Sequence, residues 1–370
     1  MNNGDIKTTC LHDCHTALGA QMSPFAGFDM PIQYEGIAEE HLAVRNACGI
    51  FDVSHMGEVT VTGPEAEKFV NHIFTNDVTN APDFKIFYGM MLHANGGTID
   101  DLLVYKRCDN NFLLVINAAN IDKDVAHIME QAKNYDVEVK NISDPTGEIA
   151  IQGPDSEKVM LEALGLDCKD LVFYTFMETT LPLNGAPVLV SRTGYTGEDG
   201  FEIYSDTATT RLCWNKLMES GLVKPCGLGC RDTLRFEVGL PLYGDELTDE
   251  ITPLEASLGI FVKLDKPEFI GREALAAQKE AGVSRKLVGL EIKDRAIARH
   301  GAEVILPATG EVIGAVTTGY RGISVDKSIA MALIDSRYAA LGTELQVKVR
   351  RKVFPAVVTA KKFYNKSYKK

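Results

Sequence analysis

An internal repeat constrains the fold of this chain more than any other feature. Residues 60–70, TVTGPEAEKFV, return 90 residues later as AIQGPDSEKVM at residues 150–160. Each copy predicts a strand, a break at Gly-Pro, and then a helix with proline near its first turn, where a missing backbone donor does no harm. The repeat therefore predicts two related units of mixed α and β structure. The apolar face of the first helix comprises Ala66, Phe69, Val70, Ile73 and Phe74.

Three short strands are predicted between the two copies, over residues 88–93, 98–106 and 111–117. The turn sequences ANGG and CDN connect them. Strands joined by such short turns pair in an antiparallel fashion. A helical pattern follows, and Asn120 is its predicted N-cap.

The second of these strands carries two adjacent acids, Asp100 and Asp101, in an otherwise apolar run. Successive side chains of a strand point to opposite faces, so the two acids enter different environments. A buried carboxylate is costly, and a protein pairs it, neutralises it or uses it. A structural acid at the mouth of the Gly-Gly turn and a functional acid are both open interpretations.

The two turns predict the neighbours of Asp101. If His93 faces Thr98 across the first turn, Asp101 lies opposite Met90 and diagonal to Tyr88. If Arg107 faces Asn111 across the second turn, Asp101 also lies opposite Asn117. A slip of one residue would reverse the facing. In the predicted register, four side chains converge: Asp101, Tyr88, Tyr105 and Asn117.

The second half of the chain predicts a hairpin and then a barrel. The hairpin strands, 187–195 and 201–204, enclose the loop GYTGEDG, which does not fit a dinucleotide-binding pattern and is either a functional loop or an ordinary turn. From Arg285 onward, short alternating runs indicate a small all-β barrel or sandwich. The predicted units are residues 1–140, 141–280 and 281–370. The predicted barrel strands are 286–292, 303–306, 312–318, 328–333, 345–349 and 353–359.

Composition excludes several classes of protein. The formal net charge of −13 opposes binding to duplex nucleic acid, which relies on lysine and arginine. The first ten residues are polar and do not have the pattern of a secretory signal, and the sequence contains no apolar run typical of a membrane span. We therefore expect a cytoplasmic protein with neither a nucleic-acid nor a membrane partner.

The eight cysteines are expected to be reduced thiols. Two groups invite a metal: Cys10 with His12, Cys14 and His15, and the pair Cys226 and Cys230. Their spacing differs from that of zinc sites, so no metal is expected. Five lysines crowd the last ten residues, and they either are solvated or dock an acidic partner or ligand. They are Lys361, Lys362, Lys366, Lys369 and Lys370.

Four motifs in order give the chain a resemblance to a known family. They are FDVSHMGE at 51–58, the strand at 96–105, SRTGYTGEDGFE at 191–202 and GLGCRD at 227–232. With them the chain resembles the aminomethyltransferases, the T proteins of the glycine cleavage system. The resemblance implies an α+β fold of three domains in a cloverleaf, with two related units of antiparallel sheets and helices, a C-terminal all-β barrel, and folate in a central channel.

The resemblance also implies a reaction. The methylene carbon of the aminomethyl group on the lipoyl arm of H protein passes to tetrahydrofolate, giving 5,10-methylenetetrahydrofolate, ammonia and the dihydrolipoyl arm. Tetrahydrofolate is then a co-substrate and lipoylated H protein a partner. Asp101 matches the key acid of the family beside the pterin. The residues that match folate-contacting positions are Tyr88, Tyr105, Val115, Asn117, Tyr195, Glu202 and Arg231.

These residue types suit the implied chemistry. The carboxylate of Glu202 can accept two parallel hydrogen bonds from a pterin. As an ordinary aspartate, Asp101 is expected to be ionised at neutral pH and to favour the positive charge that develops on the attacking nitrogen. We expect His55 to pack or cap rather than to catalyse, because geometry must come before protonation chemistry.

Two departures from the family and two alternatives remain open. Residues 318–324 read TGYRGIS where relatives commonly have Ser-Gly-x-x-Ser-Pro, and the tail offers lysines where some relatives place an arginine near folate. The alternatives are a related tetrahydrofolate-dependent demethylase and a non-catalytic folate-binding protein. The signature KGCYxGQE of the latter relatives is absent from the sequence.

Overall fold

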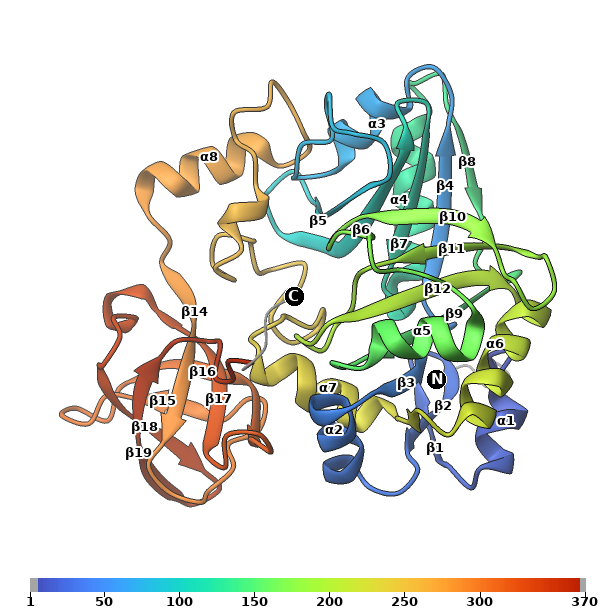
Figure 1. The fold of residues 1–370 in the computed structure, drawn as a ribbon. Coiled ribbons are helices and arrows are strands. Elements are labelled where there is room, and N and C mark those ends of the chain that lie inside the picture. Colours follow the sequence, from blue (N-terminus) through green and yellow to red (C-terminus); the bar gives the residue numbers. More distant parts are fainter. Residues whose placement is uncertain (1–5, 367–370) are drawn as a thin grey trace.

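The computed structural model describes residues 6–366, which form two large sheets with helices, a two-stranded sheet and a closed barrel (Figure 1). The first sheet has the strand order β5-β6-β7-β4-β8. Helices α3 (Ala66–Ile73) and α4 (Ile121–Ala132) cover one of its faces, where Phe69, Val70 and Ile128 pack against strand residues such as Val104. Its strands are β4 (Gly57–Thr62), β5 (Lys85–Leu92), β6 (Thr98–Cys108), β7 (Asn111–Ile116) and β8 (Glu138–Asn141).

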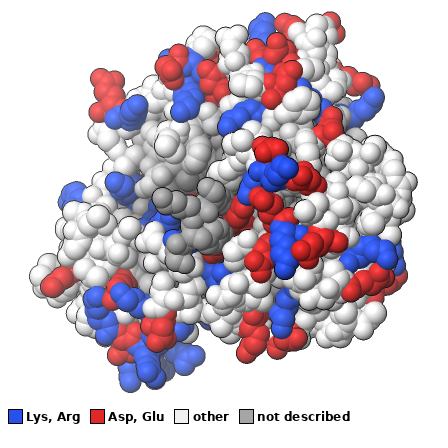
Figure 2. Space-filling view, in the orientation of Figure 1, with Lys and Arg blue, Asp and Glu red and all other residues white. Residues whose placement is uncertain are grey.

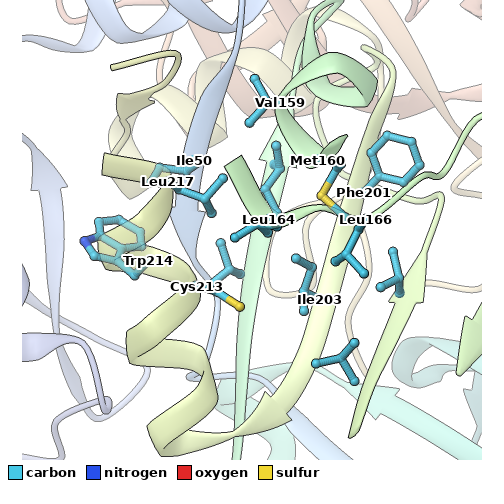
Figure 3. Close-up of a cluster of buried hydrophobic side chains, with 14 of the residues drawn as sticks. Ile50, Val159, Met160, Leu164, Leu166, Phe201, Ile203, Cys213, Trp214 and Leu217 are labelled. Atoms are coloured by element: carbon cyan, nitrogen blue, oxygen red, sulfur yellow. The ribbon is translucent and has the colours of Figure 1, made fainter. Parts of the chain in front are cut away.

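The second sheet has the order β10-β11-β12-β9-β3-β13, and all its pairings are antiparallel except that of β13 with β3. Helices α5 (Ser156–Leu164) and α6 (Thr207–Ser220) pack on it through Met160, Trp214 and Leu217, as Figure 3 shows. The strands are β3 (Gly49–Asp52), β9 (Thr146–Gln152), β10 (Phe176–Thr180), β11 (Pro187–Ser191), β12 (Gly200–Asp206) and β13 (Lys224–Pro225).

The barrel closes in the order β14-β17-β16-β15-β18-β19 around an aliphatic core. All six predicted barrel strands are confirmed. They are β14 (Arg285–Ile292), β15 (Glu303–Ile305), β16 (Val312–Arg321), β17 (Ser328–Asp335), β18 (Glu344–Val349) and β19 (Lys352–Thr359). The predicted α+β class with a C-terminal β-barrel is therefore confirmed.

Shorter elements link these parts. Each helix within residues 6–366 is too short or too polar to cross a membrane. Acidic and basic side chains intermingle over the face of the molecule in Figure 2. The linking elements are α1 (His12–Ala17), β1 (Gln21–Phe25), β2 (Phe28–Gln33), α2 (Ile37–Asn46), α7 (Leu228–Glu237), α8 (Arg272–Ala281) and the 3₁₀ turns η1 (Ala118–Asn120), η2 (Gly259–Phe261) and η3 (Ser336–Tyr338).

The internal repeat is visible in the fold. The order β5-β6-β7-β4 of the first sheet matches β10-β11-β12-β9 of the second. Gly63 and Gly153, which end β4 and β9 in the two copies, have nearly the same φ of 136° and 134°, a region that only glycine enters readily. The two sheets are therefore equivalent strand by strand.

The equivalent units exchange one strand each. β3 precedes β4 in the chain but pairs with β9, while β8 precedes β9 but pairs with β4. The same exchange recurs in hydrogen bonds. The Glu58 amide donates to Ser143 Oγ at 2.9 Å, and the Glu148 amide donates to Ser54 Oγ at 3.0 Å. The division at residues 140 and 280 stays a prediction about units, and neither sheet is drawn from one unit alone.

Candidate active site

A chamber of about 630 Å³ lies where the two sheets, α7 and the irregular segment 239–261 meet. Seven of the eight predicted site residues line this chamber: Asp101, Tyr88, Val115, Asn117, Tyr195, Glu202 and Arg231. They come from β5, β6 and β7 of one sheet, β12 of the other, the loop after β11, and α7. The wall combines aromatic rings with buried acids.

Asp101 is buried in the chamber wall. The Tyr88 hydroxyl donates to its Oδ2 at 2.9 Å, and Asn117 Nδ2 donates to its Oδ1 at 3.0 Å. Asp101 pairs with Met90, as predicted, although Thr98 pairs with Leu92 rather than with His93 and a bulge between Met91 and Leu92 restores the register. Burial, followed by the charge of neighbouring Asp100, raises the pKa of Asp101 to about 7. The expectation of a fully ionised Asp101 is therefore wrong, and near neutral pH this acid exchanges a proton readily.

Asp100 points away from Asp101 and is fully hydrogen-bonded. Its Oδ2 accepts from the Asn117 amide at 2.9 Å, and its Oδ1 accepts from the side chains of Asn117 and Asn120 at 2.9 and 2.6 Å. Asn120 is the N-cap residue of α4, as predicted, but its side chain makes no cap bond and donates to this carboxylate instead. Asp100 thus holds Asn117, whose amide also holds Asp101.

Glu202 and Arg231 bring a carboxyl and a guanidinium to the chamber from β12 of the second sheet and from α7. Thr193 Oγ1 donates to Glu202 Oε2 at 2.5 Å, and burial raises the pKa of Glu202 while Thr193 and Arg231 lower it. The Arg231 guanidinium lies 5.1 Å from the centre of the Tyr195 ring, whose hydroxyl donates to the Pro241 carbonyl. Arg231 Nη1 is buried with no hydrogen-bond partner among the described residues. It is free to donate to a ligand.

Tyr105 is the predicted site residue that the structure does not bring to the chamber wall. Its ring is fully buried between the two sheets, 5.2 Å from the ring of Phe176. Its hydroxyl bonds to the Tyr204 hydroxyl at 2.9 Å and donates to Ser191 Oγ at 3.2 Å. The predicted strand face does carry Asp101 and Tyr105, but that face runs from the chamber into the core. Tyr105 supports Tyr204, which does line the chamber.

Other lining residues were not predicted to be site residues. His55 is buried against Phe25, its Nδ1 has no partner among the described residues, and burial lowers its pKa to about 4. The sequence around Glu148 resembles that around Asp101, because each acid lies within an apolar strand. Tyr243 and Phe261 lie in the irregular segment, where no sequence periodicity marks them. These four residues all line the chamber.

One lysine of the basic tail also reaches the chamber. Lys361 Nζ donates to the Ala256 carbonyl at 2.8 Å, and burial lowers its pKa to about 8. Lys369 and Lys370 lie outside the described residues. The tail thus supplies a cation to the wall without the planar fork of an arginine.

One group of potential metal ligands comes together within residues 6–366, namely Glu40, Cys226 and Cys230. The Glu40 carboxylate already accepts from the amides of Tyr34 at 2.6 Å and Gly227 at 2.8 Å. Burial raises the pKa of the Cys230 thiol well above its usual value. A satisfied carboxylate and a neutral thiol are poor metal ligands. In the N-terminal group, His15 bonds to Asp52 and His12 to Asp29.

Two related α+β units and a barrel around one acid-lined chamber define the class, a transferase of the aminomethyltransferase type. The model of the GCVT N-terminal domain matches residues 11–266, and that of the glycine cleavage T-protein C-terminal barrel domain matches residues 285–365. The chain belongs to the glycine cleavage T-protein family. It is an aminomethyltransferase of the glycine cleavage system, from a family that uses tetrahydrofolate as a substrate.

Curated relatives and a solved structure extend over the whole chain. The aminomethyltransferase of Alkaliphilus oremlandii is 50% identical over 369 residues, which is 99% of this chain and 100% of the relative. That of Thermoanaerobacter pseudethanolicus is 49% identical with the same coverage. The crystal structure of glycine cleavage system aminomethyltransferase T from Bartonella henselae aligns with a TM-score of 0.93 and 33% identity, covering 99% of this chain and 100% of that one.

Proposed function

We propose that the chamber binds tetrahydrofolate and that Asp101 acts at its reacting nitrogen. Glu202 and Arg231 hold the polar edge of the pterin, while Tyr88, Val115 and Tyr195 pack against the ring, since tyrosines offer apolar faces and a polar tip. Asn117 fixes Asp101, and Tyr105 braces the wall from behind. The observation that carries this proposal is the meeting of Asp101, Glu202 and Arg231 in one enclosed chamber.

The second substrate in this proposal is the aminomethyl group on the lipoyl arm of H protein. A folate nitrogen attacks the methylene carbon, and the second folate nitrogen closes the ring. The C–S and C–N bonds break, and the two folate N–H protons leave with the sulfur and the amine. The products are methylenetetrahydrofolate, the dihydrolipoyl arm and ammonia. Asp101 favours the positive charge on the attacking nitrogen, accepts its proton, and with a pKa near 7 can pass the proton on.

The test is an assay of the purified chain with aminomethyl-loaded H protein and tetrahydrofolate. Ammonia and methylenetetrahydrofolate should form together in equal amounts. If ammonia stays at the level of the enzyme-free control while tetrahydrofolate binds to the chain, the proposal is wrong. No requirement for an added metal is expected.

Replacing Glu202 by glutamine should weaken tetrahydrofolate binding by about tenfold or more, since hydrogen bonds to a charged group contribute about 1.5–3 kcal/mol. Turnover at saturating folate should change by less than this factor, because Glu202 comes from β12 of the second sheet and Asp101 from β6 of the first. Calorimetric titration gives the affinity, and ammonia release gives the turnover. A variant that binds folate normally but turns over slowly would contradict the binding role.

The reaction rate should depend on pH through Asp101. Its raised pKa of about 7 means that the carboxylate form, which accepts the proton, gains population as pH rises through 7 and is lost below it. We therefore expect kcat to increase with pH between about 6 and 8, with an inflection near 7. The Asp101→Asn variant should lose this inflection. A flat profile for the wild type would show that Asp101 does not titrate in the rate-determining step.

A further inference from the structure

The internal repeat places two buried carboxyl groups at equivalent positions. Glu58 lies in β4 and Glu148 in β9, 90 residues apart, and each side chain is at most 2% exposed. Among the residues that the structure describes, Glu148 lines the chamber, whereas Glu58 is not part of its wall. The chamber wall therefore includes Glu148. Glu58, the equivalent residue outside the wall, can serve as a control for substitutions of Glu148.

Glu148 lies beside Glu202 on one face of the second sheet. In the pairing of β9 with β12, Ala150 faces Glu202 and Glu148 faces Tyr204. Alternate residues of a strand share a face, so the two glutamates are diagonal neighbours, a separation that long side chains span. Ala150, which shares their face of the sheet, is fully buried and has only a methyl side chain. Two carboxyl groups therefore present themselves to the same end of the chamber.

Only one of these carboxyl groups is suited to carry the negative charge. Glu202 has Thr193 as a donor and Arg231 as a nearby cation, whereas Glu148 Oε2 has no hydrogen-bond partner among the described residues. Burial raises the pKa of Glu148 well above its usual value. Two carboxyl groups facing it, Glu202 from β12 and Glu58 from β4, raise this pKa further, while Arg231 from α7 and the Tyr204 hydroxyl oppose them. Burial raises the pKa of Glu58 itself well above its usual value. Glu148 is then a neutral acid whose O–H can donate.

A pterin offers a matching edge. Its N3–H and 2-amino group are donors, and the acceptors O4 and N1 lie on either side of them. A carboxylate that takes the two donors leaves a flanking acceptor that needs a donor of its own. On the basis of the proposed folate site, we propose that Glu148 is a specificity-determining residue. Its carboxyl group donates a hydrogen bond to the pterin acceptor that lies beside the two donors held by Glu202.

The experiment measures tetrahydrofolate binding to the full chain at pH 7 by calorimetric titration. Glu148→Gln keeps a donor of nearly the same shape and should bind within about threefold of the wild type. Glu148→Leu leaves the pterin acceptor unpaired and should bind about tenfold or more weakly. The matched variant Glu58→Gln changes the equivalent acid outside the chamber wall and should bind like the wild type. Circular dichroism and the unfolding midpoint establish that each variant is folded.

The possible results distinguish a failure of the proposed role of Glu148 from a failure of the proposed folate site. Binding by Glu148→Leu as tight as that of the wild type overturns the inference alone, and so does binding by Glu148→Gln as weak as that of the leucine variant. A folded wild type that binds no tetrahydrofolate overturns the proposed function as well. Infrared spectroscopy adds a readout that does not depend on the leucine variant. The carboxylic C=O band that Glu148→Gln removes should shift when tetrahydrofolate binds, and a band insensitive to folate contradicts the donor role.

Discussion

The Asp101→Asn variant should release ammonia about 10²–10⁴ times more slowly than the wild type, the range expected when a positioned acid or base is lost. The asparagine has the shape of the aspartate, so its oxygen can accept from Asn117 while its amide nitrogen donates to the Tyr88 hydroxyl, but it cannot take the proton of the attacking nitrogen. The affinity for tetrahydrofolate should stay within about threefold, because the contacts through Glu202 and Arg231 are intact. Single-turnover ammonia release with loaded H protein measures the first effect, and calorimetric titration measures the second.

The ratio of the two effects distinguishes a catalytic residue from a binding residue. A fall in affinity as large as the fall in turnover would show that Asp101 only holds folate. The Glu202→Gln variant provides the opposite pattern in the same assay. Comparing the two also tests whether the chamber separates into a binding side and a reacting side, as the positions of Glu202 and Asp101 suggest.

The sequence predicted the surroundings of Asp101 because they depend on short-range pattern. Two tight turns and the two-residue period of a strand determine which residues face each other in β5, β6 and β7, and the structure confirms the pairing of Asp101 with Met90. The same local alternation, repeated at short intervals, predicted all six barrel strands. Local periodicity is sufficient to predict strand pairing where strands that are consecutive in the chain are also adjacent in the sheet.

Features that depend on distant parts of the chain could not be predicted in this way. The exchange of β3 and β8 joins residues far apart in the chain, such as Asp52 with Ile149 and Thr62 with Glu138, and no local pattern marks such a pairing. The place of Tyr105 depends on where the second sheet closes over the first, which the alternation within one strand does not show. The raised pKa of Asp101 depends on burial by the segment 239–261, whose irregular backbone carries no periodic signal.

Arg45 connects the parts of the molecule that surround the chamber. From α2, its Nη1 donates to the Thr196 carbonyl at 2.7 Å and to Glu198 at 2.8 Å, both in the loop that carries Tyr195. Its Nη2 donates to Glu237 of α7 at 3.3 Å, and its Nε donates to Ser324 of the barrel at 3.2 Å. The side chains of Arg45, Glu198 and Glu237 are almost fully buried. This one guanidinium therefore compensates two buried carboxylates and joins three elements.

Replacing Arg45 by methionine should lower the free energy of unfolding by about 3–5 kcal/mol, because removing one partner leaves buried charges uncompensated. Denaturant unfolding followed by the fluorescence of Trp214, the single tryptophan, measures this loss. The control is Arg337→Met, which removes an exposed ion pair with Asp335 and should leave the free energy of unfolding nearly unchanged. Because Glu198 and Tyr195 share a loop, Arg45→Met should also weaken folate binding in the fraction that stays folded. Equal, small losses in both variants would show that the buried cluster is relaxed by solvent and does not hold the chamber together.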